Sequence, residues 1–343
     1  MLLAAALLAA RTFMREFQRV AERRAQSRGV LSSPIPMPAL GGVASWLGAP
    51  AGAPAPGTPM ALVIFSTTDP GAGELLAEAE AWHDAYATHG VRVIGLHRPA
   101  FAFAADTARL VRALQRLGVS FPVAHDPSFA VPLPRFQGTT ILVGEANGPA
   151  VAIQTRAEAS AADLWLRARY SGRAIPLPRP PHERLPLRAL LRLGAGQVRR
   201  GPLANAAPEQ PATFVTQTRA EEEGRSWVPV PVGRWTPRAG GLESTRGGAA
   251  NFLAIRYHAA RVGVVVSPPA GTRARIWILR DDAWVAGNVR GRDLEVATDG
   301  ATFVDVDEPR LLVPIEKDSG WHVLKLSPDI PGVELHALTF DGP

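Results

Sequence analysis

The sequence predicts an α/β domain followed by an all-β domain, with an amphipathic helix ahead of both. Three observations predict this order. From Met60 onward, short apolar runs alternate with helical patterns, which is typical of an α/β layer. After residue 212 the apolar residues recur at every second position, in short runs divided by Gly, Pro and Asp turns. A stretch rich in proline and arginine, 172–211, lies between the two regions and indicates a linker.

Composition limits the classes of function that fit. The chain has 343 residues, enough for two domains with cores of ordinary size. Its net charge of +6 is small for that length and comes with no nucleic-acid-binding motif, so no nucleic-acid partner is expected. The sequence contains no cysteine. Disulfides, cysteine–metal sites and thiol nucleophiles are therefore all excluded.

The first 30 residues predict one amphipathic helix with a basic and an apolar side. On the basic side an arginine recurs at every fourth position: Arg11, Arg15, Arg19 and Arg23. The apolar side includes Phe13 and Phe17. Such a helix would dock on the protein itself, on a partner chain or on an anionic membrane surface. We expect a protein partner, with membrane-surface contact as the alternative.

The start of this helix bears on location. Its first ten residues are apolar but too few to span a bilayer, and no basic segment precedes them. We therefore expect a cytoplasmic protein or one held peripherally at a membrane. If a signal segment is missing ahead of the sequence as given, the protein would be extracytoplasmic.

Residues 38–171 carry the pattern of the α/β domain. Five apolar runs predict strands, at 61–65, 91–96, 121–126, 139–144 and 150–155. Three helical patterns lie among and after them, at 74–90, 104–118 and 157–170, and the first two end at a glycine. The last two strands are joined by a short Gly- and Asn-containing turn, which predicts a hairpin. Parallel crossovers followed by a hairpin predict a mixed sheet flanked by helices.

Three segments of this domain resemble a known family. They are "GGVASWLGAP" at 41–50, "VIGLHRPAFAF" at 93–103 and "LGVSFPVAHDP" at 117–127. Together they resemble the thioredoxin-like fold, in the redoxin or TlpA-type branch that has a central insertion. The resemblance implies that the first strand leads into a Trp-Cys-x-x-Cys motif at a helix N-terminus, facing a cis-proline loop.

The sequence departs from that family at each reactive position. Alignment of "FSTTDPGAGELL" with the motif puts Pro70 and Gly73 where the two cysteines would be. Gly138 stands where the cis-proline would be, and Ser66 replaces the usual aromatic residue. Thiol–disulfide exchange needs a thiolate and a second sulfur, and the chain has neither. The resemblance therefore implies a cysteine-free pseudoenzyme of the thioredoxin fold.

Other side chains near the degenerate motif are candidates to replace its chemistry. Asp69 precedes a Pro-Gly turn, where a capping or turn role is expected rather than a base. His97 and His125 end predicted strands and are expected to be satisfied polar groups. An enzyme using Asp69, Glu74 or a histidine remains as a third hypothesis. No metal-ligand spacing occurs, so no metal or other cofactor is expected.

The linker and the C-terminal region complete the prediction. Within 172–211, a short helix is expected at about Leu185–Leu193. Over 212–343, nine short strands with no long helix between them predict an antiparallel sandwich of the jelly-roll type.

The C-terminal region also resembles a known domain. The segments "GRWTPRAGGLEST" at 233–245 and "PRLLVPIEKDSGWHVLKLSPDIPGVELHALTFDG" at 309–342 carry the resemblance. They are similar to the carbohydrate-binding-module-like sandwich that follows the thioredoxin domain in DipZ-type thiol carriers. The resemblance implies sugar binding, for which exposed aromatic rings are needed. Trp284, which follows a turn, is the ring expected to be exposed, whereas most sandwich tryptophans belong to the core.

Two functions follow from these observations. The first is a non-catalytic interaction, scaffold or accessory subunit, with a binding surface drawn from Phe13, Phe17, Phe65, Asp69 and Trp284. The alternative is a carbohydrate- or cell-envelope-binding protein that acts through the C-terminal jelly roll. An apolar hollow around Phe65, Pro70 and Gly138 would favour the first, and a ring-lined groove at Trp284 the second.

Overall fold

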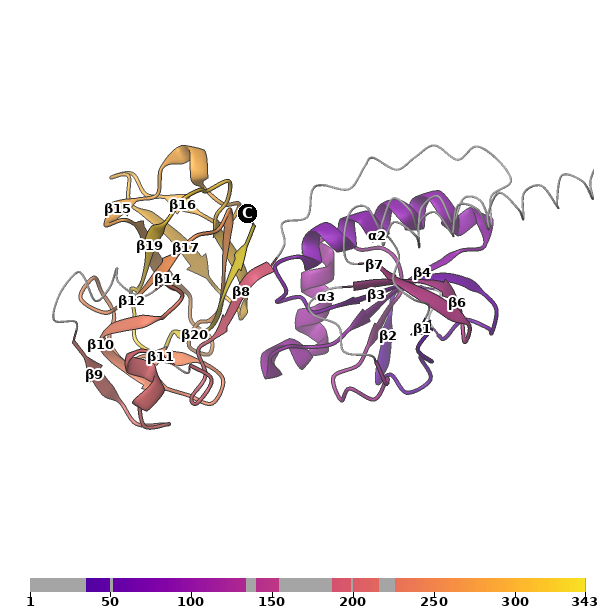
Figure 1. The fold of residues 1–343 in the computed structure, drawn as a ribbon, viewed down its shortest axis with the longest axis horizontal. Helices are drawn as coiled ribbons and strands as arrows, with labels where there is room; N and C mark the ends of the chain where they lie inside the picture. Colours follow the sequence, from indigo (N-terminus) through magenta and orange to yellow (C-terminus); the bar gives the residue numbers. More distant parts are fainter. Residues whose placement is uncertain are drawn as a thin grey trace, which may run out of the picture. The chain divides into compact units, whose positions relative to one another are not determined.

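The computed structural model describes residues 35–49, 52–133, 140–153, 187–198, 200–215 and 226–342. The chain divides into an N-terminal unit, Met1–Arg184, and a C-terminal unit, Leu185–Pro343 (Figure 1). The expected helices over 1–30 and 157–170 lie outside the described residues, and so do Phe13, Phe17 and Gly138.

The N-terminal unit is built on a seven-stranded mixed sheet. Its strand order is β1-β7-β6-β3-β4-β5-β2. The strands are β1 (Ile35–Pro36), β2 (Ser45–Leu47), β3 (Pro59–Phe65), β4 (Arg92–His97), β5 (Val123–His125), β6 (Thr140–Glu145) and β7 (Pro149–Ile153). Strands β3, β4 and β5 are parallel to one another, and β6 and β7 form an antiparallel hairpin. The predicted mixed sheet and its hairpin are confirmed.

Two α-helices connect the parallel strands. They are α2 (Ala72–Tyr86) and α3 (Thr107–Arg116), with short 3-10 turns at Ala87–His89 and Ala102–Ala105. The turn after α2 ends at Gly90 with φ +81°, a left-handed conformation that glycine adopts without strain. Asp106 caps the N-terminus of α3, since its side chain accepts a hydrogen bond from the backbone N–H of Arg109 at 2.9 Å.

Strand β3 shows why the sheet is buried on both faces. Alternate residues of its apolar run point to opposite sides, as a strand requires. Ala61, Val63 and Phe65 pack with the buried faces of α2 and α3. Met60, Leu62 and Ile64 pack on the other side with residues that include Met37, Leu40 and Val131.

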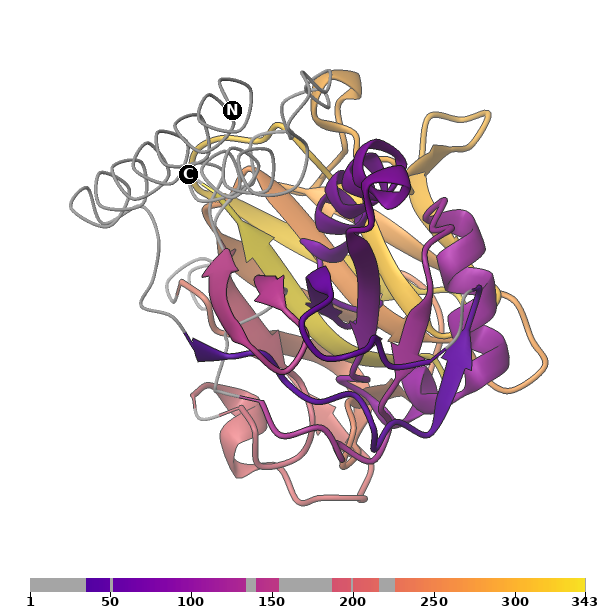
Figure 2. The same cartoon turned by 90° about the vertical axis from the view of Figure 1, so that its right-hand side faces the viewer.

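The C-terminal unit is antiparallel β structure throughout its named strands. These are β8 (Leu187–Arg192), β9 (Ala212–Phe214), β10 (Val230–Pro237), β11 (Leu242–Ser244), β12 (Phe252–Tyr257), β13 (Arg261–Ser267), β14 (Ala274–Arg280), β15 (Ala283–Trp284), β16 (Glu295–Val296), β17 (Thr302–Val306), β18 (Arg310–Ile315), β19 (His322–Pro328) and β20 (Glu334–Asp341). All nine expected strands are present, and in the described part of this unit the helices are two short 3-10 turns, Pro202–Asn205 and Gly287–Val289. Figure 2 shows these strands, coloured from pink through orange to yellow, from a second direction.

Strand β10 joins two groups of strands in this unit. Its first residues, Val230 to Val232, pair with β12, and its later residues pair with β9 and β11. Side chains from both groups meet in one core, which includes the fully buried Trp235, Tyr257 and Phe340. The jelly-roll connectivity stays a prediction.

The expected helix at about Leu185–Leu193 is wrong. Residues 187–192 form strand β8, which pairs antiparallel with β20 (Figure 1). Ala189 and Leu191 pack against the core, whereas Leu190 is exposed, so the burial follows a period of two. The free edge of β20 supplies backbone partners that override the weak local preference for helix. This part of the expected linker therefore belongs to the C-terminal unit.

Candidate functional site

The turn after β3 is the first candidate, because it holds the degenerate motif. The Ser66 hydroxyl lies 2.9 Å from the Thr68 hydroxyl and accepts a hydrogen bond from the Ala100 N–H at 3.2 Å. The Asp69 carboxylate accepts the Gly71 N–H at 3.1 Å, directly ahead of α2. The predicted turn role of Asp69 is confirmed. These contacts hold the turn together through its own side chains and the neighbouring loop.

The structure also places the residues at the two former cysteine positions. Pro70 is buried, and Gly73 lies in the first turn of α2, partly exposed. Phe65 is only 2% exposed and packs in the core against the His97 ring, at 5.3 Å between ring centroids. Its expected role in a binding surface is therefore wrong, because the last residue of a strand buried on both faces points into the core.

Two histidines meet at the carboxyl ends of β4 and β5. His97 and His125 are opposite each other in the parallel ladder, and both are buried. Their Nδ1 atoms are 3.1 Å apart, and their rings stack at 5.1 Å between centroids. The sequence indicated two separate strand-end histidines, and the register of β4 and β5 makes them a pair.

Hydrogen bonding assigns the protons of this pair. The Nε2 atom of His125 lies 2.9 Å from the carbonyl oxygen of Ala105, which can only accept, so that nitrogen carries a proton. The Nδ1 atom of His125 can then accept a hydrogen bond from the protonated Nδ1 of His97. The remaining Nε2 of His97 is buried and has no hydrogen-bond partner in the described part of the chain. Burial, and then the neighbouring His125, lower the pKa of His97 to about 3.

An ion pair lies beside the histidines. Arg98 Nε is 3.4 Å from Asp126 Oδ2, and the Asp126 carboxylate also accepts the N–H groups of Ala130 and Val131 at 2.7 and 3.2 Å. The Arg98 guanidinium lies 4.6 Å from the ring centroid of Phe129, which is exposed. The arrangement fixes the loop after β5 and neutralises a fully buried carboxylate.

The C-terminal unit has an aromatic cluster around Trp284. Trp284 is 45% exposed, as expected, and its ring lies 6.1 Å from that of Trp277. Trp277 is opposite Phe303 in the β14–β17 ladder, with 5.6 Å between ring centroids. The Arg275 guanidinium stacks 3.6 Å over Phe303 and pairs with Asp305 at 3.0 Å. We call Trp277, Trp284 and Phe303 the β14 aromatic cluster.

A second exposed tryptophan escaped the sequence analysis. Trp321 is 48% exposed, and the guanidinium of Arg256 lies 5.1 Å from its ring centroid. Trp227 and His258 lie 6.1 and 5.4 Å from the same ring. The position of Trp321 just before β19, after the turn glycine Gly320, is the signal that could have identified it.

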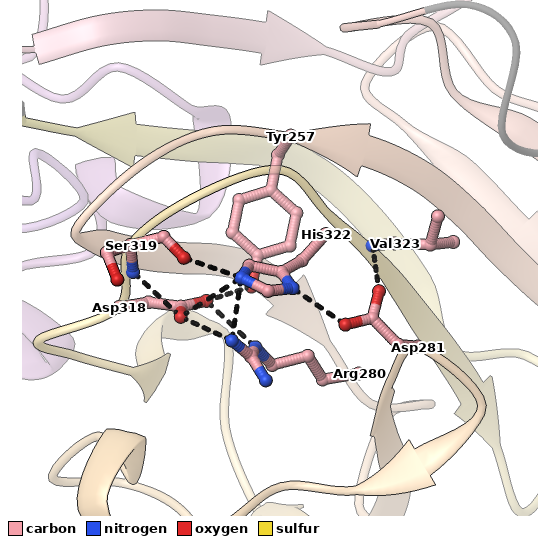
Figure 3. Close-up of polar contacts among 7 residues, drawn as sticks. All are labelled: Tyr257, Arg280, Asp281, Asp318, Ser319, His322 and Val323. Atoms are coloured by element: carbon pink, nitrogen blue, oxygen red, sulfur yellow. Dashed lines mark hydrogen bonds and ion pairs between the residues drawn. The ribbon is translucent and has the colours of Figure 1, made fainter.

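A polar network is centred on the buried residues Asp318 and Tyr257 (Figure 3). Asp318 accepts hydrogen bonds from the Tyr257 hydroxyl at 2.6 Å and from Arg280 Nη2 at 2.8 Å. His322 continues the network, since its Nδ1 lies 2.6 Å from the Asp281 carboxylate. Burial raises the pKa of Asp318, but the hydrogen bonds from Arg280 and Tyr257 outweigh it and hold that pKa below its usual range. The network is a structural anchor for the loop between β18 and β19.

The described residues contain neither a cluster of metal ligands nor a helix able to span a membrane. No group of three or more His, Asp or Glu side chains there is arranged to hold a metal ion. None of the helices in the described ranges has the length and apolar character needed to cross a membrane.

Comparison with known proteins finds a similarity at the sequence level over part of the chain. Over 98 residues the chain is 26% identical to Protein DipZ of Mycobacterium bovis (strain ATCC BAA-935 / AF2122/97), and to the same extent to Protein DipZ of Mycobacterium tuberculosis (strain CDC 1551 / Oshkosh). The match covers 27% of this chain and 14% of each relative. The chain thus spans a small part of the curated relatives it matches. No protein-family profile matches the chain.

Solved structures give similarities at low scores. One is a thioredoxin-like protein in the oxidized form, with 16% identity, a TM-score of 0.32 and coverage of 39% of this chain and 95% of that one. Another is a secreted disulfide oxidoreductase of Mycobacterium tuberculosis homologous to E. coli DsbE, with 18% identity, a TM-score of 0.24 and coverage of 33% and 81%. The fold assignment rests instead on the strand order above, which agrees with the thioredoxin-like arrangement that the resemblance implies.

Proposed function

We propose that this chain is a thioredoxin-like protein whose thioredoxin-like unit is non-catalytic and that acts as an interaction, scaffold or accessory subunit. One observation carries the proposal: the sequence has no cysteine. Thiol–disulfide exchange therefore has neither an attacking nor a resolving sulfur. The contacts of the β3–α2 turn support the same conclusion, since Asp69 and Ser66 use their side chains to stabilise the turn.

The partner surface that we propose is the apolar side of the helix expected over residues 1–30. Phe13 and Phe17 are large apolar side chains, and each would cost about 1.5–3 kcal/mol to leave in water rather than buried. A protein partner would cover them.

Co-purification from native cells tests this role. The variant Phe13→Asp/Phe17→Asp should lose the partners of the wild type while circular dichroism remains unchanged. A matched variant, Arg11→Gln/Arg15→Gln, changes the basic side of the same helix and should keep them. If the arginine variant alone loses association, and added salt has the same effect, the helix binds an anionic surface instead. If the double Asp variant keeps every partner, the proposal is wrong.

The second candidate function is carbohydrate binding by the C-terminal unit. The β14 aromatic cluster favours it, because the exposed ring of Trp284 and the partly exposed ring of Trp277 lie beside charged groups, an arrangement suited to the apolar faces and hydroxyls of sugars. Affinity electrophoresis in gels that contain soluble polysaccharides tests it. Trp284→Ala should abolish retardation, whereas Trp321→Ala removes a ring of equal exposure outside the cluster and should not. Equal mobility of wild type and Trp284→Ala in every gel would reject this candidate.

A further inference from the structure

Ser267 and His336 form a close polar pair in the C-terminal unit. Ser267 is the last residue of β13, and His336 lies on the neighbouring strand β20. The Ser267 hydroxyl oxygen is 2.6 Å from His336 Nε2. Ser267 is partly exposed, whereas His336 is 5% exposed. The hydroxyl of a partly exposed serine is thus hydrogen-bonded to a buried imidazole.

The tautomer of this imidazole follows from its second contact. His336 Nδ1 lies 3.0 Å from the carbonyl oxygen of Gly240, which can only accept a hydrogen bond. The Nδ1 atom therefore carries the proton, and Nε2 presents a lone pair to the Ser267 hydroxyl. Burial lowers the pKa of His336, which keeps the ring neutral near pH 7. These are the protonation state and the orientation that a general base needs.

Backbone packing fixes that orientation. A side chain at Gly241 would lie 2.6 Å from the carbonyl oxygen of Leu335, so only glycine lets the β10–β11 turn approach β20 this closely. The approach brings the Gly240 carbonyl to the imidazole. Glu334 adds a carboxylate oxygen 3.6 Å from His336 Nδ1, where it would stabilise an imidazolium. Glu243, on the adjacent strand β11, lies opposite Glu334 and forms an ion pair with Arg238 at 2.7 Å.

We propose that Ser267 and His336 are a nucleophile–base pair that takes an acyl group from carboxylic esters. The Ser267 oxygen forms a bond to the ester carbonyl carbon as its proton passes to His336 Nε2. The carbon–oxygen bond to the alcohol then breaks, and the alcohol leaves with that proton. Water attacks the acyl group by the same route, which releases a carboxylic acid and restores the serine. This activity is separate from the thiol chemistry absent from the N-terminal unit.

Covalent labelling of the full chain tests the proposal. A fluorophosphonate probe, followed by peptide mass spectrometry, should modify Ser267 and leave the exposed Ser319 unmodified. Ser267→Ala should lose the label, and His336→Gln should slow labelling by about a hundredfold or more. Hydrolysis of p-nitrophenyl acetate should fall in parallel. The proposal would be overturned if Ser267 is not labelled, or if it is labelled no faster than Ser319.

A second measurement does not depend on the folding of His336→Gln. Because the chain has no cysteine, Ser267→Cys introduces its only thiol, and iodoacetamide then reports that thiol alone. Pairing with His336 should lower the thiol pKa below the usual value of about 8.5, so alkylation at pH 7 should be at least about tenfold faster than in Ser319→Cys. Equal alkylation rates and equal pH profiles in the two variants would contradict a nucleophile–base pair.

Discussion

The Nδ1 atoms of His97 and His125 lie 3.1 Å apart in a buried pair at the ends of two parallel strands. A proton added to His97 would create a buried cation. Burial therefore favours the neutral form of His97.

Acid should destabilise the N-terminal unit for this reason. The pKa of His97 falls from 6.5 to about 3 on folding, so below pH 6.5 the unfolded chain binds a proton that the folded chain excludes. The stability is complete above pH 6.5 and should fall by about 1.4 kcal/mol per pH unit between there and pH 3. Hydrogen exchange of the β4 and β5 amides at pH 7.5 and at pH 5 measures this loss of stability. His97→Phe should flatten this dependence, and His89→Gln should not.

The Asp318 network should dominate the stability of the C-terminal unit around β19. Asp318→Asn removes the charge that Arg280 and Tyr257 face, which we expect to cost about 3 kcal/mol in the free energy of unfolding. Asp307, which is exposed, provides the control, and Asp307→Asn should change stability by less than about 0.5 kcal/mol. Urea unfolding, monitored by circular dichroism, compares the stabilities of the two variants. Equal midpoints would mean that the network contributes no net stability.

Strand β8 should be required for a stable C-terminal unit. A fragment that begins at residue 185 keeps the β8–β20 pairing, and a fragment that begins at 212 loses it together with the buried Leu193. The shorter fragment should melt at a lower temperature, since each lost apolar side chain contributes about 1.5–3 kcal/mol. Identical melting curves would show that β8 adds nothing.

The β6–β7 hairpin should not tolerate a side chain at Gly144. A Cβ atom there would lie 2.2 Å from the carbonyl oxygen of Pro149, so Gly144→Ala must push the two strands apart. We expect a loss of about 1–3 kcal/mol. Gly41→Ala is the matched control, because a Cβ atom at Gly41 would meet no atom within 4 Å. Thermal unfolding that is unchanged in Gly144→Ala would contradict the register of this hairpin.

The sequence indicated the elements whose pattern is local. The apolar runs of β3, β4 and β6, the glycine after α2 and the period of two beyond residue 212 all correspond to observed structure. The predictions were wrong where the structure or burial of a residue depends on a partner that is distant in the sequence. Strand β8 depends on the edge of β20, and the burial of Phe65 depends on the face that α2 and α3 cover.

Side-chain pairs across strands were the least predictable features. His97 and His125 are 28 residues apart, and Ser267 and His336 are 69 apart, so no local spacing reveals them. Each pair is set by strand register, which one sequence does not specify. Asp69 was predictable because its role is confined to its own turn.

Dithiothreitol-driven reduction of insulin tests the central claim most directly. The wild-type chain should match the buffer rate. Pro70→Cys/Gly73→Cys should add little activity, because position 70 is buried, which disfavours a thiolate. A thiolate there would also need a hydrogen-bond donor, and the Asp69 carboxylate already accepts the Gly71 N–H ahead of α2. Turnover by the wild-type protein well above buffer would contradict the claim that the thioredoxin-like site has lost its chemistry.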